Sequence, residues 1–263
     1  MSSFLQKIHD INVERVAQAR AAVPISDLER TPLFARQAGN VLQAFRNDDY
    51  SVIAEIKFAS PSEGDIAAGD PVEIADGYLA SGATMLSILT EPQFFKGDLA
   101  YLQAVREKHP KALLLRKDFM VDPYQLYEAK AHGADAILII VAMTPPAVTK
   151  ELFEAAKRLG LAALVEVHDG AELDAAIELG ADFIGVNNRN LKTLKTDLGI
   201  GRDLAARKPK NSVFICESGL STADDLRDMK SRGYDGFLMG TSFMRQPQPG
   251  RALHDLQEQL KCA

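Results

Sequence analysis

Four segments of the chain repeat one pattern, in which a glycine follows a helix-like stretch and precedes an apolar run. They begin at Ser81, His132, Leu179 and Arg232 and read SGATMLSIL, HGADAILII, LGADFIGVN and RGYDGFLMG. A glycine at a helix end adopts the left-handed conformation at little cost and lets the chain turn into a strand. The repeated glycines lie roughly 50 residues apart, about twice the length of one βα unit. They are Gly82, Gly133, Gly180 and Gly233.

The alternate strands of such a repeat are found between these segments. Apolar runs cover Ser51–Lys57, Ala112–Leu115, Leu161–Val167 and Val213–Cys216, which gives eight short strands separated by helical patterns. Strands apolar on both faces are typical of a parallel sheet covered by helices. We therefore predict an α/β fold, a (β/α)8 TIM barrel over residues 51–263. A doubly wound open sheet is the competing fold, but no glycine-rich dinucleotide loop follows the first strand.

Helix starts are marked by prolines and capping residues. The signals are Pro71, Asp122 before Pro123, Thr144 before Pro145, and a capping-box sequence from Ser221 to Asp224. Residues 1–50 form an N-terminal helical extension of a single domain spanning 1–263. Its apolar residues Phe4, Leu5, Ile8, Ile11, Val16 and Ala17 are spaced as an amphipathic helix, and Thr31-Pro32 begins another. The extension either closes the bottom or side of the barrel or covers the active mouth.

Charge and composition exclude several classes of protein. The net charge is −6 and the pI about 5.5, so no basic field exists to attract nucleic acid or a membrane surface. No apolar run reaches the roughly 18 residues of a transmembrane helix, and the first 20 residues lack a secretory signal. The two cysteines, Cys216 and Cys262, form no Cys-x-x-Cys motif and indicate a reducing compartment, which we expect to be the cytoplasm. Cys216 lies in an apolar run and is interpreted as a core residue, and the five histidines have no metal-ligand spacing, so no metal site is expected.

Polar residues stand at the carboxyl ends of the predicted strands, where barrels of this kind build their active sites. Charged groups inside apolar strands are costly to bury unless they are paired or used in chemistry. Two lysines, three glutamates and an asparagine therefore predict a catalytic cluster. These are Glu55, Lys57, Lys117, Glu166, Asn187 and Glu217. Arg116, by contrast, is interpreted as a solvated or outward-facing charge.

Small residues follow the seventh and eighth predicted strands. Ser218-Gly219 and Gly240-Thr241 place backbone N–H groups where the fold commonly binds phosphate. We therefore expect a phosphate site there, for a small anionic molecule rather than a polymer.

The sequence resembles the indole-3-glycerol phosphate synthase family, over nearly its whole length and including the N-terminal extension. The matching motifs are AEIKFASPS from Ala54, LSILTE from Leu86, FFKG from Phe94, LRKDF from Leu115, DPYQ from Asp122, LVEVH from Leu164, GVNNRNL from Gly185 and ESGL from Glu217. The resemblance implies conversion of 1-(2-carboxyphenylamino)-1-deoxyribulose 5-phosphate to indole-3-glycerol phosphate, carbon dioxide and water. It implies a lyase of tryptophan biosynthesis that needs no cofactor.

The resemblance also implies roles for individual residues. Lys117 would protonate or polarise the ketone, Glu166 and Lys57 are the acid–base candidates for dehydration, and Glu55 would hold charge in place. Which lysine is the dehydration acid stays open. Asn187 and Arg189 would orient the substrate, and Glu217 would bind a hydroxyl or support the lysines. Ser60, Gly219, Gly240 and Thr241 would form the phosphate site, with Lys57 nearby. The aromatic ring would contact Phe95 and Phe119, although core packing explains Phe95 equally well. Thr241 stands where the family often has serine, and it keeps the hydroxyl.

Three alternatives remain. The two lysines could form Schiff bases, as in aldolase barrels. The chain could instead be another phosphosugar barrel, such as a phosphoribosylanthranilate isomerase, although its first strand lacks the cysteine normal for that reaction. It could also be a binding module without turnover. We expect a monomer or a weak homodimer, with the phosphosugar–anthranilate substrate as the small-molecule partner.

Overall fold

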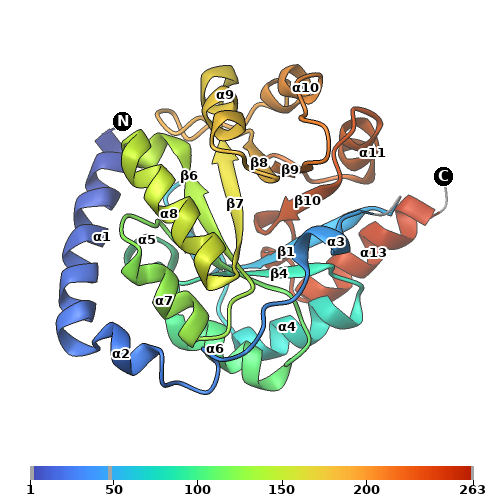
Figure 1. Cartoon of the computed structure of the whole chain (residues 1–263). Helices are drawn as coiled ribbons and strands as arrows, with labels where there is room; N and C mark the ends of the chain where they lie inside the picture. The colour runs from blue at the N-terminus through green and yellow to red at the C-terminus, as the bar shows by residue number, and fades with distance from the viewer. Residues whose placement is uncertain (1–2, 47–48, 262–263) are drawn as a thin grey trace.

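The computed structural model describes residues 3–46 and 49–261, and in this part of the chain eight parallel strands close into a barrel (Figure 1). Each strand pairs with its neighbours in chain order, and the last pairs with the first through Ser51 and Gly236. The strands are β1 (Ser51–Ile56), β4 (Met85–Leu89), β5 (Leu114–Lys117), β6 (Ala136–Ile140), β7 (Ala162–Val167), β8 (Phe183–Asn187), β9 (Val213–Glu217) and β10 (Gly236–Met239). The predicted (β/α)8 barrel is confirmed.

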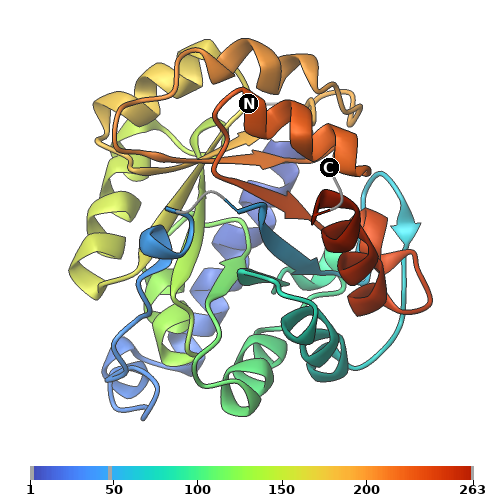
Figure 2. The same ribbon diagram turned by 90° about the vertical axis from the view of Figure 1, so that its right-hand side faces the viewer.

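Helices cover the outside of the barrel between consecutive strands (Figures 1 and 2). The main helices are α4 (Pro71–Ala80), α6 (Leu99–Lys108), α7 (Tyr124–Ala131), α8 (Pro146–Leu159), α9 (Gly170–Glu178), α10 (Gly199–Ala205), α11 (Ala223–Ser231) and α13 (Pro249–Lys261). Shorter elements lie at strand ends: the hairpin β2 (Ala59–Ser60) and β3 (Gly64–Asp65), α5 (Pro92–Phe95), the 3-10 turn η1 (Val141–Met143) and α12 (Thr241–Met244). All four repeat glycines have positive φ, between 77° and 99°, as the helix-end interpretation requires.

The predicted helix starts are confirmed with one shift and one exception. Asp122 accepts a hydrogen bond from the backbone N–H of Tyr124, at the start of α7. The capping box before α11 is one residue further on than predicted, with Thr222 and Asp225 as its members. At α8 no side chain caps the helix, so Thr144 does not serve as a cap there.

The N-terminal extension consists of α1 (Ser3–Ala22), α2 (Ile25–Leu28) and α3 (Val41–Ala44). Helix α1 lies along the side of the barrel, packs near α7, and brings its first turn to the active mouth (Figure 1). Its buried stripe includes Asn12, whereas Ala17, predicted to face inward, is exposed. The predicted helix from Thr31 is wrong: residues 31–36 form turns, because Arg36 is held by the carbonyls of Gly133 and Ala134 and by the Asp135 carboxylate.

Strand β5 differs from the prediction in a way that matters for the site. It begins at Leu114 and includes Arg116 and Lys117, whereas the apolar run predicted residues 112–115. Arg116 is 2% exposed, so it is not solvated, and of the two interpretations only the outward-facing one is confirmed. Its guanidinium faces α7, where it donates to the Gln125 carbonyl at 2.7 Å and contacts the Glu128 carboxylate at 3.3 Å. A strand residue beneath a helix can carry charge when that helix supplies acceptors.

Cys216 is a buried free thiol, as predicted for a core residue, while Cys262 lies outside the described residues. Within the described part of the chain, no helix is both long and apolar enough to cross a membrane.

Candidate active site

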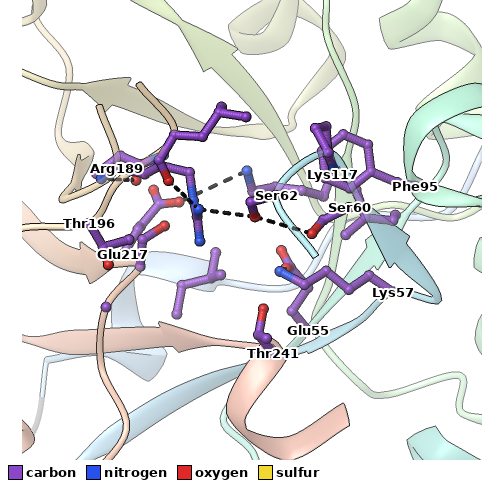
Figure 3. A pocket seen from close by; sticks show the side chains of 18 of the residues that line it. Glu55, Lys57, Ser60, Ser62, Phe95, Lys117, Arg189, Thr196, Glu217 and Thr241 are labelled. Atoms are coloured by element: carbon purple, nitrogen blue, oxygen red, sulfur yellow. Dashed lines mark hydrogen bonds and ion pairs between the residues drawn. The ribbon is translucent and has the colours of Figure 1, made fainter. Parts of the chain in front are cut away.

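One cavity, of about 330 Å³, opens at the carboxyl ends of the barrel strands. Figure 3 shows Arg189, Thr196 and Glu217 at its left and Lys57 and Phe95 at its right. All fourteen site residues expected from the sequence line this cavity. They are Glu55, Lys57, Ser60, Phe95, Lys117, Phe119, Glu166, Asn187, Arg189, Glu217, Ser218, Gly219, Gly240 and Thr241. The structure thus brings them together, and their individual roles stay predictions.

Lys117 stands among three carboxylates at the end of β5. Its Nζ lies 3.3 Å from Glu166 Oε2 and 3.9 Å from Glu217 Oε2. Burial alone would lower the pKa of Lys117, but the charges of Glu166, Glu217 and Glu55 outweigh it and raise the pKa well above its usual value. Lys117 is therefore a cation at neutral pH, held at the centre of the cavity.

Glu55 and Lys57 form the second charged pair, at the end of β1. Lys57 Nζ lies 2.7 Å from Glu55 Oε1, and Ser87 donates to Glu55 Oε2 at 3.3 Å. Burial disfavours the charged form of Glu55, yet Lys57 and Lys117 keep its pKa below the usual value. Gly240 leaves room for this carboxylate, since a Cβ there would lie 2.8 Å from Glu55 Oε1.

The pKa values of the two remaining carboxyl groups, Glu166 and Glu217, are shifted in opposite directions. Burial opposes the charge of Glu166, but Lys117 and further contacts hold its pKa well below normal. Burial and the negative charge of Glu166 raise the pKa of Glu217 to about 8. Two like charges near one ammonium group are not both favoured, so Glu166 is the more readily ionised member of the pair and Glu217 the one that more readily keeps a proton.

Supporting residues hold these groups, and several were not foreseen. Asn187 donates to Glu166 Oε1 at 2.9 Å. Asn188 points the other way, donating to the carbonyls of Glu217 and Ser218 at 2.9 and 3.2 Å. Gly185 lies so close to Glu217 that a Cβ would stand 1.9 Å from its Oε1. Both Asn188 and Gly185 lie in the GVNNRNL motif, but the sequence alone does not show that one holds the Glu217 turn and the other leaves space for Glu217.

The expected phosphate end of the cavity is formed by tight turns. Ser218 and Gly219 both have positive φ, 64° and 81°, at the turn after β9. Ser218 is not a glycine, so this conformation is strained and is held by the contact of its carbonyl with Asn188.

Loop contacts across the mouth join the β1 loop to its neighbours. Arg189 donates to Ser62 Oγ at 3.1 Å and to the Leu194 carbonyl at 2.7 Å. Glu63 pairs with Arg245 after α12, on the side where Figure 2 shows the hairpin beside the chain segment that follows β10. Both Ser62 and Arg245 line the cavity; Ser62 ends the AEIKFASPS motif but was not assigned a role, and Arg245 belongs to none of the matching motifs.

An aromatic wall stands opposite the tight turn at Ser218 and Gly219. The rings of Phe95 and Phe119 lie 5.8 Å apart, and both line the cavity. Glu91 fixes Phe95 by accepting its backbone N–H at 3.1 Å. Asp118 fixes the other side, because it accepts from the N–H of Phe119 and from Arg15 of α1.

Deeply buried charged groups that line a cavity, in addition to pairing with each other, are typical of catalytic sites. The fold and the cavity together define a (β/α)8-barrel enzyme whose site suits a small anionic molecule.

Comparison with known proteins makes this class specific. The family model for indole-3-glycerol phosphate synthase matches residues 5–256. Curated proteins of that name include one from Acidovorax sp. (strain JS42), 42% identical over 97% of this chain and 99% of its own length. Another, from Aromatoleum aromaticum (strain DSM 19018 / LMG 30748 / EbN1), is 43% identical over 97% and 99%. The chain belongs to the indole-3-glycerol phosphate synthase family.

Solved structures confirm the fold alone. A 3-hexulose-6-phosphate synthase from Salmonella typhimurium superposes with a TM-score of 0.65 at 15% identity, over 81% of this chain and 99% of that one. A thiamine phosphate pyrophosphorylase from Pyrococcus furiosus gives 0.60 at 19% identity, over 82% and 97%.

Proposed function

We propose that this chain catalyses the reaction of its family, the conversion of 1-(2-carboxyphenylamino)-1-deoxyribulose 5-phosphate to indole-3-glycerol phosphate, carbon dioxide and water. It is a carboxy-lyase, consistent with a role in tryptophan biosynthesis. The observation that carries the assignment of roles is the placement of Lys117 between Glu166 and Glu217, on the wall of the one cavity that also holds the aromatic pair and the tight turns.

Lys117 acts first, at the ketone. Ring closure joins the carboxylate-bearing ring carbon to the carbonyl carbon, and negative charge develops on the carbonyl oxygen. A buried ammonium group stabilises that oxygen and supplies its proton. Carbon dioxide then leaves with the ring–carboxyl bond electrons returning to the ring, which restores its conjugation.

Dehydration completes the indole. An acid protonates the departing hydroxyl, and its C–O bond breaks with help from the nitrogen lone pair. A base then removes a proton from the neighbouring ring CH2, so that the ring C=C bond forms and the nitrogen keeps its hydrogen. Glu166 is the base, because its lowered pKa keeps it ionised and its position beside Lys117 faces the cavity. We assign the acid to Lys57, which directly follows strand β1 on the opposite side of the barrel and has Glu55 as its partner; Lys117 is the alternative.

The two ends of the substrate occupy different walls. Its phosphate lies at Ser218, Gly219, Gly240 and Thr241, with Ser60 nearby. Its aromatic ring lies against Phe95 and Phe119, and Asn187 and Arg189 orient the parts between. The phosphate side of the cavity is formed by the turns after β9 and β10, and the aromatic side is formed by α5 and the loop after β5.

The test is direct. Purified protein is incubated with the substrate while indole fluorescence is followed, for the wild type, for Lys117→Met, and for Lys150→Met as a matched control on the surface of α8. Lys150 has a side chain that is 68% exposed, so its loss should leave turnover unchanged. We expect Lys117→Met to lose about 10²–10⁴-fold in kcat, the usual contribution of a general acid. Absence of product from folded wild-type protein, or full turnover in Lys117→Met, overturns the proposal.

We further propose that residues 1–263 act as a single domain, as a monomer or weak homodimer in the cytoplasm. The contact of the first turn of α1 with the cavity supports treating the extension as part of the catalytic unit. Sedimentation of the purified chain across concentrations tests the oligomeric state.

A further inference from the structure

His168 lies directly behind Glu166, outside the set of residues that line the cavity. It follows β7, and its side chain is only 9% exposed. Its Nε2 stands 3.1 Å from Glu166 Oε1, and its Nδ1 stands 3.0 Å from Glu172 Oε2. The same Glu172 oxygen accepts the backbone N–H of His168 at 2.8 Å, so the start of α9 fixes the ring in place.

The imidazole is thereby clamped between two carboxylates from different elements. Burial alone would lower the pKa of His168, but contacts with Glu166 and Glu172 raise it to about 10. At neutral pH the ring is a cation. The described structure has four alternating charges in a row: Glu172 on α9, His168, Glu166 on β7 and Lys117 on β5.

The two contacts of the ring differ in kind. In the part of the chain that the structure describes, Nε2 makes no hydrogen bond of good geometry, so its 3.1 Å approach to Glu166 is an ion pair. Asn187 already donates to that same oxygen at 2.9 Å. What His168 adds to Glu166 is therefore positive charge rather than a second directional bond.

We propose that His168 is a positioning residue that keeps Glu166 ionised and directed at the cavity when Lys117 engages the substrate. The inference rests on the proposed function of Glu166 as the base. In the unliganded site Lys117 compensates Glu166, but a lysine that donates its proton or turns to the substrate no longer does so. A buried carboxylate left without a cation takes up a proton and cannot act as a base. While Lys117 engages the substrate, the imidazolium of His168 supplies the positive charge that keeps Glu166 ionised.

The effect of His168 extends to the second carboxylate of the pair. Glu217 on β9 is also held toward its ionised form by the charge of His168, among larger influences from burial, Glu166, Lys117 and Glu55. Removing the imidazole should therefore shift the ionisation of the Glu166–Glu217 pair to higher pH. Glu166 lies 3.1 Å from the imidazole, and an opposite charge this close moves a carboxyl pKa by about one unit or more.

The variants are His168→Gln, Glu172→Gln and the double variant, with His132→Gln as matched control. His132 is a half-buried histidine at the end of α7 that bonds the Glu128 carbonyl at 2.8 Å, so its removal disturbs a helix end away from the row. The measurements are kcat and KM across pH, and carboxyl titration by NMR of protein carrying 13C-labelled glutamate, which needs no turnover.

For His168→Gln we expect kcat to fall roughly ten- to a hundredfold, the scale of a misplaced catalytic group, with KM unchanged because His168 does not line the cavity. The titration of the pair moves up by about one pH unit. Glu172→Gln lowers kcat and raises the titration of the pair in the same way, but by smaller amounts. The double variant has the same kcat and titration as His168→Gln, because the two residues act through one contact. His132→Gln changes neither.

An unshifted titration in His168→Gln overturns the inference, as does a loss confined to KM. If His168→Gln does not fold, Glu172→Gln decides, since that side chain is 20% exposed and its loss is milder; an unshifted titration there has the same meaning. A wild type without turnover refutes the proposed function alone, because the titration would still report the charge of His168.

Discussion

Replacing Gly185 by alanine tests whether the position of Glu217 matters to turnover. The new Cβ would lie 1.9 Å from Glu217 Oε1 and 3.0 Å from its Cδ, and 3.3 Å from Leu164 Cδ1. Glu217 must therefore move by about 1 Å, a displacement that can cost a catalytic site 10²-fold. Its Oε1 has no hydrogen-bond partner among the described residues, so the carboxylate tip can turn without losing a bond.

The cost in stability should be much smaller than the cost in rate. Overpacking a core costs about 1–3 kcal/mol, and alanine regains about 0.4–1 kcal/mol by restricting the unfolded chain. We expect a net loss of about 1–2 kcal/mol, which lowers Tm by about 2–6 °C. The fall in kcat/KM should then be about a hundredfold in protein that is fully folded at the assay temperature.

The assay is steady-state indole fluorescence together with a thermal melt. Gly69→Ala is the matched control, because its Cβ would meet only Ile74 Cδ1 at an ordinary 3.6 Å. That variant should keep both activity and Tm. A folded Gly185→Ala enzyme with unchanged kcat/KM would show that the placement of Glu217 is not critical.

Three further outcomes follow from the fold and its charges. The pKa of Glu217 is raised from 4.5 to about 8, so between these pH values the folded chain binds a proton that the unfolded chain has lost, and the free energy of unfolding falls as pH rises. In urea unfolding, Glu217→Gln should become more stable relative to the wild type across that window, and the difference should be constant above it. Asp135→Asn removes the ion partner of Arg106, which is 1% exposed, and should cost about 3–5 kcal/mol in urea unfolding while kcat stays normal, because the pair lies at the opposite end of the barrel. Thr222→Ala removes a helix cap and should cost about 1 kcal/mol, measured by the same unfolding curves. No effect of Asp135→Asn on stability, or equal behaviour of Glu217→Gln and wild type at every pH, would contradict these arguments.

The barrel could be predicted because its signals are local and repeated. A glycine such as Gly133 must adopt positive φ where a helix turns into a strand, and the next apolar run then has to be buried on both faces. The strand-end rule located the site, since the carboxyl ends of parallel strands converge without any knowledge of the loops.

Other features depend on contacts that only the folded chain creates. The end of β5 was predicted too early because Arg116 is tolerated inside a strand only when Gln125 and Glu128 lie above it. The roles of Gly185 and His168 were missed for the same reason: one leaves space and the other supplies charge to a residue that is distant in sequence. Neither property leaves a pattern of spacing in a single chain.

Strand β5 presents consecutive residues to opposite sides, and this couples the outer layer to the cavity. Lys117 faces inward, while Arg116 and Asp118 on either side of it are tied to one another at 3.2 Å and, through Asp118, to Arg15 of the first helix. The backbone that carries the inward lysine is thus clamped from outside the barrel. A substitution in the outer helices, at a residue that contacts no ligand, can consequently lower turnover by moving Lys117. An activity measurement alone would not show that such a substitution acts from outside the cavity.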